Sequence, residues 1–197
     1  MKLGPLVTPV SRRRPQKLAR ETVTLSRLSH GRLVLGVGLG VNSGGELTRF
    51  HEVDDDRLRA ARLDEGLELL TKLWSGEPVN HQGPHFFAEG VTFLPRPEGS
   101  IPIWVAARSP RPAIMARAAR YDGICPETTP DGLREMLRLI TAARGSLEGF
   151  DVVARGRPGD DPAPWRSAGA TWWVEELASG AGIGDVEALI RRGPVRL

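Results

Sequence analysis

The sequence predicts an α/β fold built on a parallel sheet, and two observations support this. Short apolar runs alternate with segments of helical periodicity along most of the chain, which is the pattern of βαβ units. The apolar runs, such as residues 33–37, lack strict alternation, as is typical of parallel strands buried on both faces. The pattern fits both an open doubly wound sheet and a (β/α)8 barrel, and the barrel typically needs ~250 residues. With 197 residues, both architectures remain open.

The first strand and helix are followed by a second strand of similar character. A strand is expected over residues 3–10, and Pro15 then suits the first turn of a helix. Leu18, Thr22, Leu25 and Leu28 follow at helical spacing, and Gly31 is typical of a helix end. The next expected strand covers residues 32–38, and a loop from Gly40 to Gly45 leads away from it.

A long helix is expected over residues 55–74. Leu63, Leu67, Leu70 and Trp74 share one face, and charged residues occupy the other. The acidic run 54–56 opens this helix, where carboxylates complement the helix dipole, so we interpret it as capping rather than as a metal site. Residues 76–99, rich in Gly, Pro, His and Phe, interrupt the alternation and are expected to form a hairpin-like insertion.

Alternation resumes in the second half of the chain and brings the expected strands to six. No linker separates the two halves, so residues 1–197 are interpreted as a single domain. Either Asp160 or Asp161 is expected to cap a short helix that runs toward Ala168. The remaining expected strands are 101–106, 122–126, 150–155 and 170–174, and the remaining expected helices are 112–120, 131–143 and 185–192.

Composition excludes several classes of protein. The net charge is +3 and charges of both signs are interspersed, so nucleic acid is not an expected partner. No apolar run approaches the ~20 residues of a membrane span, and no signal peptide precedes the first strand, so we expect a soluble cytoplasmic protein without a membrane partner. Cys125 is the only cysteine, which rules out an internal disulfide; we expect it to be a small buried hydrophobe.

Two glycine- or arginine-rich stretches are candidates for ligand contacts. Gly36, Gly38 and Gly40 leave the second strand, but their spacing is not that of a dinucleotide fingerprint, so a ligand-facing loop and a plain turn both remain open. No Gly-Lys-Ser/Thr follows, which excludes a P-loop. Residues 12–14 are three consecutive arginines, either a solvated loop or an anion contact at the mouth of a site.

Residues 106–109, Ala-Ala-Arg-Ser, immediately precede an expected helix. Ser109 either caps that helix, or joins Arg108 and the free N–H groups of the helix start in holding a phosphate. A phosphate-binding α/β domain is one function that this arrangement allows. The four histidines have neither helical metal-ligand spacing nor a cysteine pair beside them, so no metal site is expected.

Taken together, motifs spread over nearly the whole chain resemble the bacterial luciferase-like family of flavin- or F420-dependent oxidoreductases. The resemblance is specific because the motifs occur in one order. They are Val7-Thr8-Pro9, Arg13-Arg14-Pro15, Leu28-Ser29-x-Gly31-Arg32, Leu35 to Gly40, Arg62 to Leu67, Leu73 to Val79, Pro102 to Ala106, Arg117 to Arg120 and Gly169 to Glu175.

The resemblance implies a (β/α)8 barrel with the cofactor at the carboxyl ends of the strands. Reduced FMN or coenzyme F420 would transfer a hydride to a small organic substrate, or react with O₂ in monooxygenation. By position, Leu6, Val7 and Thr8 would face the cofactor ring, with a cis peptide at Leu6-Val7 as in some relatives. The other implied contacts are Gly38, Leu39 and Gly40 beside the ribityl chain and Ala106, Ala107, Arg108 and Ser109 at the phosphate, where many relatives have Gly-Gly.

The chain also departs from the family pattern at its beginning. Two β/α units that precede residue 3 in relatives are absent, so the six strands correspond to strands three to eight of a partial barrel. By the resemblance, the second strand that this chain would lack carries the family's common acid/base or ring-contacting residues, often a histidine or aspartate, and no catalytic residue is therefore assigned. The alternative to an oxidoreductase is a catalytically incomplete, truncated paralogue or fragment that binds the cofactor weakly. Because the partial barrel would have open strand edges, we expect homo-oligomerisation or pairing with another chain.

Overall fold

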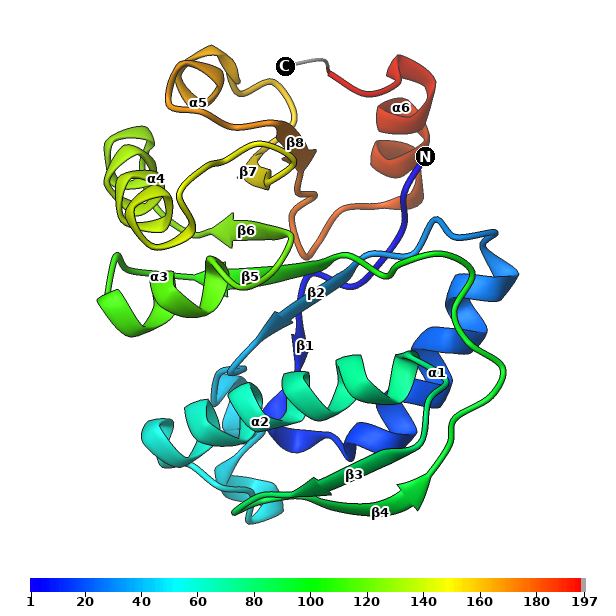
Figure 1. Cartoon of the computed structure of the whole chain (residues 1–197). Helices are drawn as coiled ribbons and strands as arrows, with labels where there is room; N and C mark the ends of the chain where they lie inside the picture. Colours follow the sequence, from blue (N-terminus) through cyan, green and yellow to red (C-terminus); the bar gives the residue numbers. More distant parts are fainter. Residues whose placement is uncertain (196–197) are drawn as a thin grey trace. The chain divides into compact units, whose positions relative to one another are not determined.

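A six-stranded parallel sheet organises the computed structural model, which describes residues 1–195 (Figure 1). The strand order is β1-β2-β5-β6-β7-β8, so each strand that follows a helical crossover is added on the same side of the previous one. This confirms the predicted α/β class with parallel strands. The strands are β1 (Thr8–Pro9), β2 (Leu35–Gly38), β5 (Ile103–Ala107), β6 (Gly123–Pro126), β7 (Asp151–Gly156) and β8 (Trp172–Glu175).

The chain divides into two compact units, residues 1–103 and 104–197, with the division inside β5. The first unit contains α1 (Pro15–Leu28) and α2 (Asp56–Trp74) together with the short 3₁₀ helices η1 (Val10–Arg12), η2 (Ser43–Gly45) and η3 (Thr48–Phe50). The expected start of α1 at Pro15 is confirmed. The two helices are joined by the indole N–H of Trp74, which donates to the Thr22 hydroxyl at 3.0 Å.

The first strand is much shorter than the predicted residues 3–10. Only Thr8 and Pro9 form a ladder, with Val37 and Gly38, while Leu3 makes an isolated bridge to Leu33. Pro5 has no N–H to donate to a ladder, and the chain turns into η1 at Val10. The prediction was therefore right about a strand at this place and wrong about its length.

The long helix α2 begins as predicted. Asp55 is its N-cap, and the carboxylate accepts from the N–H of Leu58 at 2.7 Å, so the capping interpretation of the acidic run is confirmed. The helix buries its leucine face in the core of the first unit. Fully buried side chains of this core include Leu33, Leu35, Leu47, Leu63, Leu67 and Leu70.

Residues 76–99 contain the antiparallel pair β3 (Val79–Gln82) and β4 (Phe87–Val91), whose register is irregular between Val79 and His81. Inward-facing Val79 and His81 are buried, whereas their neighbours Asn80 and Gln82 are exposed. The alternation is typical of a pair that covers a core with one face only.

The second unit contains β5 to β8 and four helices. The helices are α3 (Pro112–Ala118), α4 (Pro130–Arg144), α5 (Ala163–Ser167) and α6 (Ile183–Arg192). Their bounds differ from the predictions by a few residues. Thr129 is the N-cap of α4 and accepts from the Gly132 N–H. The N-cap of α5 is Pro162, which offers no side-chain bond, and Asp161, one residue earlier, accepts from the Ala163 N–H. The core of this unit includes Ile124, Leu133, Met136, Ile140 and Val153.

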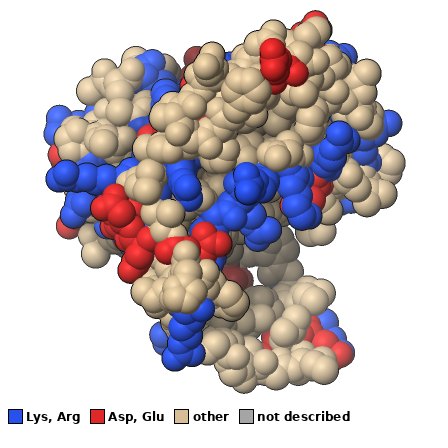
Figure 2. Space-filling model, turned by 90° about the horizontal axis from the view of Figure 1, so that it is seen from below, with Lys and Arg blue, Asp and Glu red and all other residues tan. Residues whose placement is uncertain are grey.

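Within residues 1–195, no helix combines the length and apolarity needed to cross a membrane. Basic and acidic side chains share the face of the molecule drawn in Figure 2, in keeping with their interspersion along the sequence.

Candidate functional site

The parallel pairing of β1 with β2 places six residues that the sequence singled out on neighbouring segments, Leu6 to Thr8 at the start of β1 and Gly38 to Gly40 at the exit of β2. Thr8 pairs with Val37 and Pro9 with Gly38, so the segment 6–8 runs beside β2 itself and Pro9 is level with its exit. The peptide bond between Leu6 and Val7 is cis, as the family resemblance implies. Each of these two residues is 37% exposed, which leaves a small apolar surface just before β1.

The glycines of β2 and its exit are required first by packing. A Cβ on Gly36 would lie 2.4 Å from the Pro5 carbonyl oxygen and 2.7 Å from Leu6 Cδ2. Gly40 has φ +77°, and its Cβ would lie 2.8 Å from Pro9 Cβ. Real side chains do not tolerate such distances, so glycine lets the segment before β1 lie directly against β2. The close approach to β1 accounts for both residues without a ligand.

Two side chains that sequence reasoning missed hold the loop after β2. Arg59 of α2 is 6% exposed, and one terminal nitrogen donates to the carbonyl oxygens of Leu39 and Gly40, each at 3.2 Å. Ser11 donates from its hydroxyl to the Leu39 carbonyl at 3.3 Å. Arg59 also pairs with Asp56. The sequence offered one signal of this role: Arg59 lies four positions before Leu63 and therefore on the buried face of α2.

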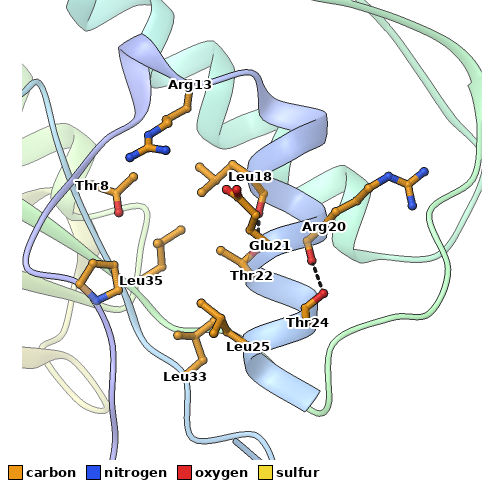
Figure 3. A pocket seen from close by; sticks show the side chains of 11 residues that line it. Thr8, Arg13, Leu18, Arg20, Glu21, Thr22, Thr24, Leu25, Leu33 and Leu35 are labelled. Carbon is orange, nitrogen blue, oxygen red and sulfur yellow. Dashed lines mark hydrogen bonds between the residues drawn. The ribbon is translucent and has the colours of Figure 1, made fainter. Parts of the chain in front are cut away.

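A groove of about 530 Å³ lies between α1 and the strand segments of the first unit, and we call it the α1 groove. In Figure 3, the side chains of Leu18, Leu25, Leu33 and Leu35 face it, and Arg13 points toward Thr8 at one end. Polar side chains also line the groove, but most of its surface is apolar, so the groove suits the packing of another apolar surface better than it suits catalysis.

The second predicted group lies in the other unit, at the carboxyl end of β5. Ala107 is buried, Ala106 and Ser109 are half-buried, and Arg108 is exposed. The interpretation of Ser109 as a helix cap is wrong. The helix α3 begins only at Pro112, with Arg111 as its N-cap and no side chain bonded there, because proline suits the first helical position and sets the start.

Arg108 belongs to a line of alternating charges that follows the strand ends of the second unit; we call it the charge chain. Glu127, after β6, accepts from Arg108 Nε at 2.5 Å and from an Arg155 terminal nitrogen at 2.9 Å. The other terminal nitrogen of Arg155 lies 2.6 Å from Glu176, after β8. Partial burial raises the pKa of Glu127, but the hydrogen bonds from the two arginines outweigh it and hold that pKa below its usual value.

Two further groups of the second unit are Asp151, half-buried at the start of β7, and Cys125 within β6. Asp151 accepts from the indole N–H of Trp104 at 3.0 Å and of Trp172 at 2.7 Å, and the two ring centroids are 5.5 Å apart. Cys125 is buried, as predicted, and burial raises the pKa of its thiol to about 12. These groups stabilise the sheet and offer no reactive nucleophile.

The predicted contact residues thus form two groups, 6–8 with 38–40 in one unit and 106–109 in the other, each ordered by its own neighbours. In neither group do the described residues include three His, Cys, Asp or Glu side chains placed to hold a metal ion.

Comparisons with known proteins agree with this fold. The family model described as luciferase-like monooxygenase matches residues 1–170. An F420-dependent glucose-6-phosphate dehydrogenase of Segniliparus rotundus is 31% identical over 189 residues, covering 89% of this chain and 54% of the relative. Monooxygenase RslO1 from Streptomyces bottropensis superposes with a TM-score of 0.67 at 27% identity, covering 80% of this chain and 50% of that structure.

A third protein shows the fold alone, at 19% identity and a TM-score of 0.62 over 80% of this chain and 48% of its own. It is the oxygenating constituent of 3,6-diketocamphane monooxygenase from Pseudomonas putida, in complex with FMN. The relatives thus include an F420-dependent enzyme, and the proteins of similar fold include one in complex with FMN. The chain spans about half the length of these relatives. Since the family model covers most of the sequence, the chain belongs to the luciferase-like monooxygenase family.

Proposed function

We propose that this chain binds FMN or coenzyme F420 and serves an oxidoreductase that acts on a small organic substrate. Family membership supports the proposal, but one observation of the structure carries it. Leu6 and Val7, immediately before β1, leave an apolar surface partly exposed, and the loop after the neighbouring strand β2 has two carbonyl groups fixed by Arg59. An ordered apolar surface next to fixed backbone fits one edge of a flat ring system.

The residues of the first unit would orient the ring. Leu6, Val7 and Thr8 would contact it, and the segment 38–40 would approach the ribityl side. When bound, the cofactor supplies the hydride or the reaction with O₂, while the protein supplies position and electrostatics. Arg59 and Ser11 contribute by keeping the loop in one conformation before the cofactor arrives, which lowers the entropic cost of binding.

Residues 106–109, taken by themselves, are the candidates for a phosphate contact. Among residues 1–195, the only acceptor found for Arg108 is Glu127, which takes its Nε–H. Both terminal nitrogens of Arg108 are thus available to phosphate oxygens, with which guanidinium forms paired hydrogen bonds. Ser109 is half-buried and does not cap α3, so its hydroxyl can contribute a further hydrogen bond. No catalytic acid or base is assigned.

The test compares cofactor affinity in matched variants. Titration of FMN and of F420, followed by fluorescence, is expected to show about tenfold weaker binding for the double variant Arg108→Ala, Ser109→Ala, as loss of charge-assisted hydrogen bonds implies. Arg138→Ala on α4, which removes one exposed arginine paired with Glu135, is the control. Equal affinity of the double variant and the wild type for both cofactors would contradict the phosphate assignment.

We also propose that a second copy of this chain covers the α1 groove. β1 is the terminal strand of the sheet, and Leu25, which lines the groove, is 46% exposed. An unpaired edge beside an exposed aliphatic groove favours association. Light scattering is expected to show a dimer or larger species; a monomer that unfolds cooperatively on heating would contradict this proposal without affecting the cofactor assignment.

A further inference from the structure

A second cavity of the first unit, of about 270 Å³, is lined by basic side chains. It differs from the α1 groove in its chemistry, although Arg13 lines both. We call it the arginine cavity. Its lining residues are Ser11, Arg12, Arg13, Arg14, Glu52, Arg62, His85 and Phe86.

The positive charge of this cavity is only partly compensated. Four guanidinium groups face one lining carboxylate, Glu52. Arg12 pairs with Glu46 at 2.9 Å, but its Nε is buried without a partner in the described part of the chain. No hydrogen-bond or ion-pair partner is found for the side chains of Arg14 and Arg62 among residues 1–195. Like charges gathered at one hollow repel each other unless an anion lies between them.

Three separate elements place these groups around the cavity. Residues 12–14 lie on η1 and at the N-cap of α1, Arg62 lies on α2, and His85 comes from the β3–β4 hairpin. The hairpin is fixed by Glu65, which accepts from the backbone N–H of His85 at 3.0 Å and of Phe86 at 2.8 Å. A charged site assembled from three anchored elements is preorganised for its ligand, in contrast to a run of solvated arginines on one loop.

We propose that the arginine cavity binds a compact anion of two or more negative charges, either a phosphate or pyrophosphate group or a short polycarboxylate. Guanidinium groups match both, since each pairs two N–H donors with two oxygens. The cavity holds several times the ~30 Å³ share of one water molecule, which is enough for such a group. The anion-contact alternative for residues 12–14 is thereby extended to Arg62 and the hairpin. This inference uses none of the residues assigned to the cofactor.

The experiment is calorimetric titration of the full chain with pyrophosphate and with citrate, at constant ionic strength. Wild type is expected to bind at least one of them saturably at one site per chain, and the tighter probe identifies which kind of anion the cavity prefers. Arg14→Gln and Arg62→Gln are each expected to weaken binding about tenfold, the loss of a charge-assisted pair. Arg62→Lys, which keeps the charge but not the planar pair, should weaken binding less than Arg62→Gln.

The matched control is Arg57→Gln. Arg57 is exposed on the same helix and, five residues earlier, projects about 140° away from Arg62. The Arg57→Gln variant has the same change of net charge as Arg62→Gln but keeps every residue that lines the cavity. Its affinity for each anion should therefore equal that of wild type. Absence of saturable binding by both probes, or equal weakening in Arg57→Gln and Arg62→Gln, would overturn the proposal. Circular dichroism of each variant verifies that a lost signal is not a lost fold.

Discussion

Replacement of Glu65 by alanine should destabilise the first unit by roughly 3 kcal/mol. This carboxylate is 9% exposed and accepts from the N–H of Phe86 at 2.8 Å, from the N–H of His85 at 3.0 Å and from the His81 ring at 3.1 Å. Hydrogen bonds to a charged group contribute ~1.5–3 kcal/mol each, and donors left unpaired in a buried site add a penalty. Two backbone donors therefore suffice for the figure given.

The assay is urea denaturation combined with hydrogen exchange over residues 79–91. A loss of about 3 kcal/mol corresponds to a midpoint of thermal unfolding lower by roughly 6–12 °C in a chain of this size, and exchange should rise first in the hairpin. The control is Glu68→Ala on the same helix, because Glu68 is exposed and its ion pair with Lys72 is worth at most about 1 kcal/mol. Surface changes usually alter the free energy of unfolding by no more than ~0.5 kcal/mol. If the free energies of unfolding of Glu65→Ala and Glu68→Ala differed by less than this margin, the reasoning would be refuted.

The difference in stability between wild type and Glu65→Ala should depend on pH, and the sign follows from the pKa of Glu65. Burial raises the pKa of Glu65, but the bonds from His81, Phe86 and His85 outweigh it and hold that pKa below its ordinary value. A carboxylate of lowered pKa stabilises the folded state above its unfolded pKa of ~4.3, and the contribution is lost as pH falls through the folded value. The difference between wild type and Glu65→Ala should therefore be largest at neutral pH and shrink below about pH 4.

Two predictions concern the second unit. Arg155→Met should destabilise this unit by about 2 kcal/mol, because Glu127 and Glu176 both lose a half-buried partner; a denaturation midpoint equal to that of the surface variant Arg138→Met would contradict this. Cys125 should not react with a thiol reagent at pH 8 in the folded protein, since it is buried and its pKa is about 12, and should react on addition of denaturant. Rapid reaction without denaturant would show that the strand end opens.

The parts of the fold that depend on local pattern were predictable. The leucine face of α2 and the proline at the start of α1 determine those helices within a few residues, and unbroken apolar runs identified the parallel strands. The length of β1 was not predictable in the same way. Its apolar residues look continuous in sequence, but Pro5 removes a donor from the ladder and the chain turns at Val10.

The candidate site was predictable only where a family motif carried it. The residues that shape it, Arg59, Glu127 and Arg155, pair with partners about 19 to 28 positions away, and nothing in their immediate sequence indicates those pairings. The prediction that Ser109 caps a helix was wrong for a related reason, since Pro112 and not the nearest hydroxyl group determines where α3 begins. Long-range pairings of polar side chains are decided by the packed fold.

Helix α2 carries both side chains that shape the neighbouring loops, Arg59 toward the exit of β2 and Glu65 toward the hairpin. In protein engineering, this makes the helix a portable unit: exchange of α2 between homologues would transfer the conformations of both loops together. Conversely, in a mutant library that varies residues 38–45 and keeps Arg59, the members would differ in side chains but share one loop conformation. In the same library without Arg59, the loop conformation itself would vary. Selection for new substrates would then begin from very different starting ensembles.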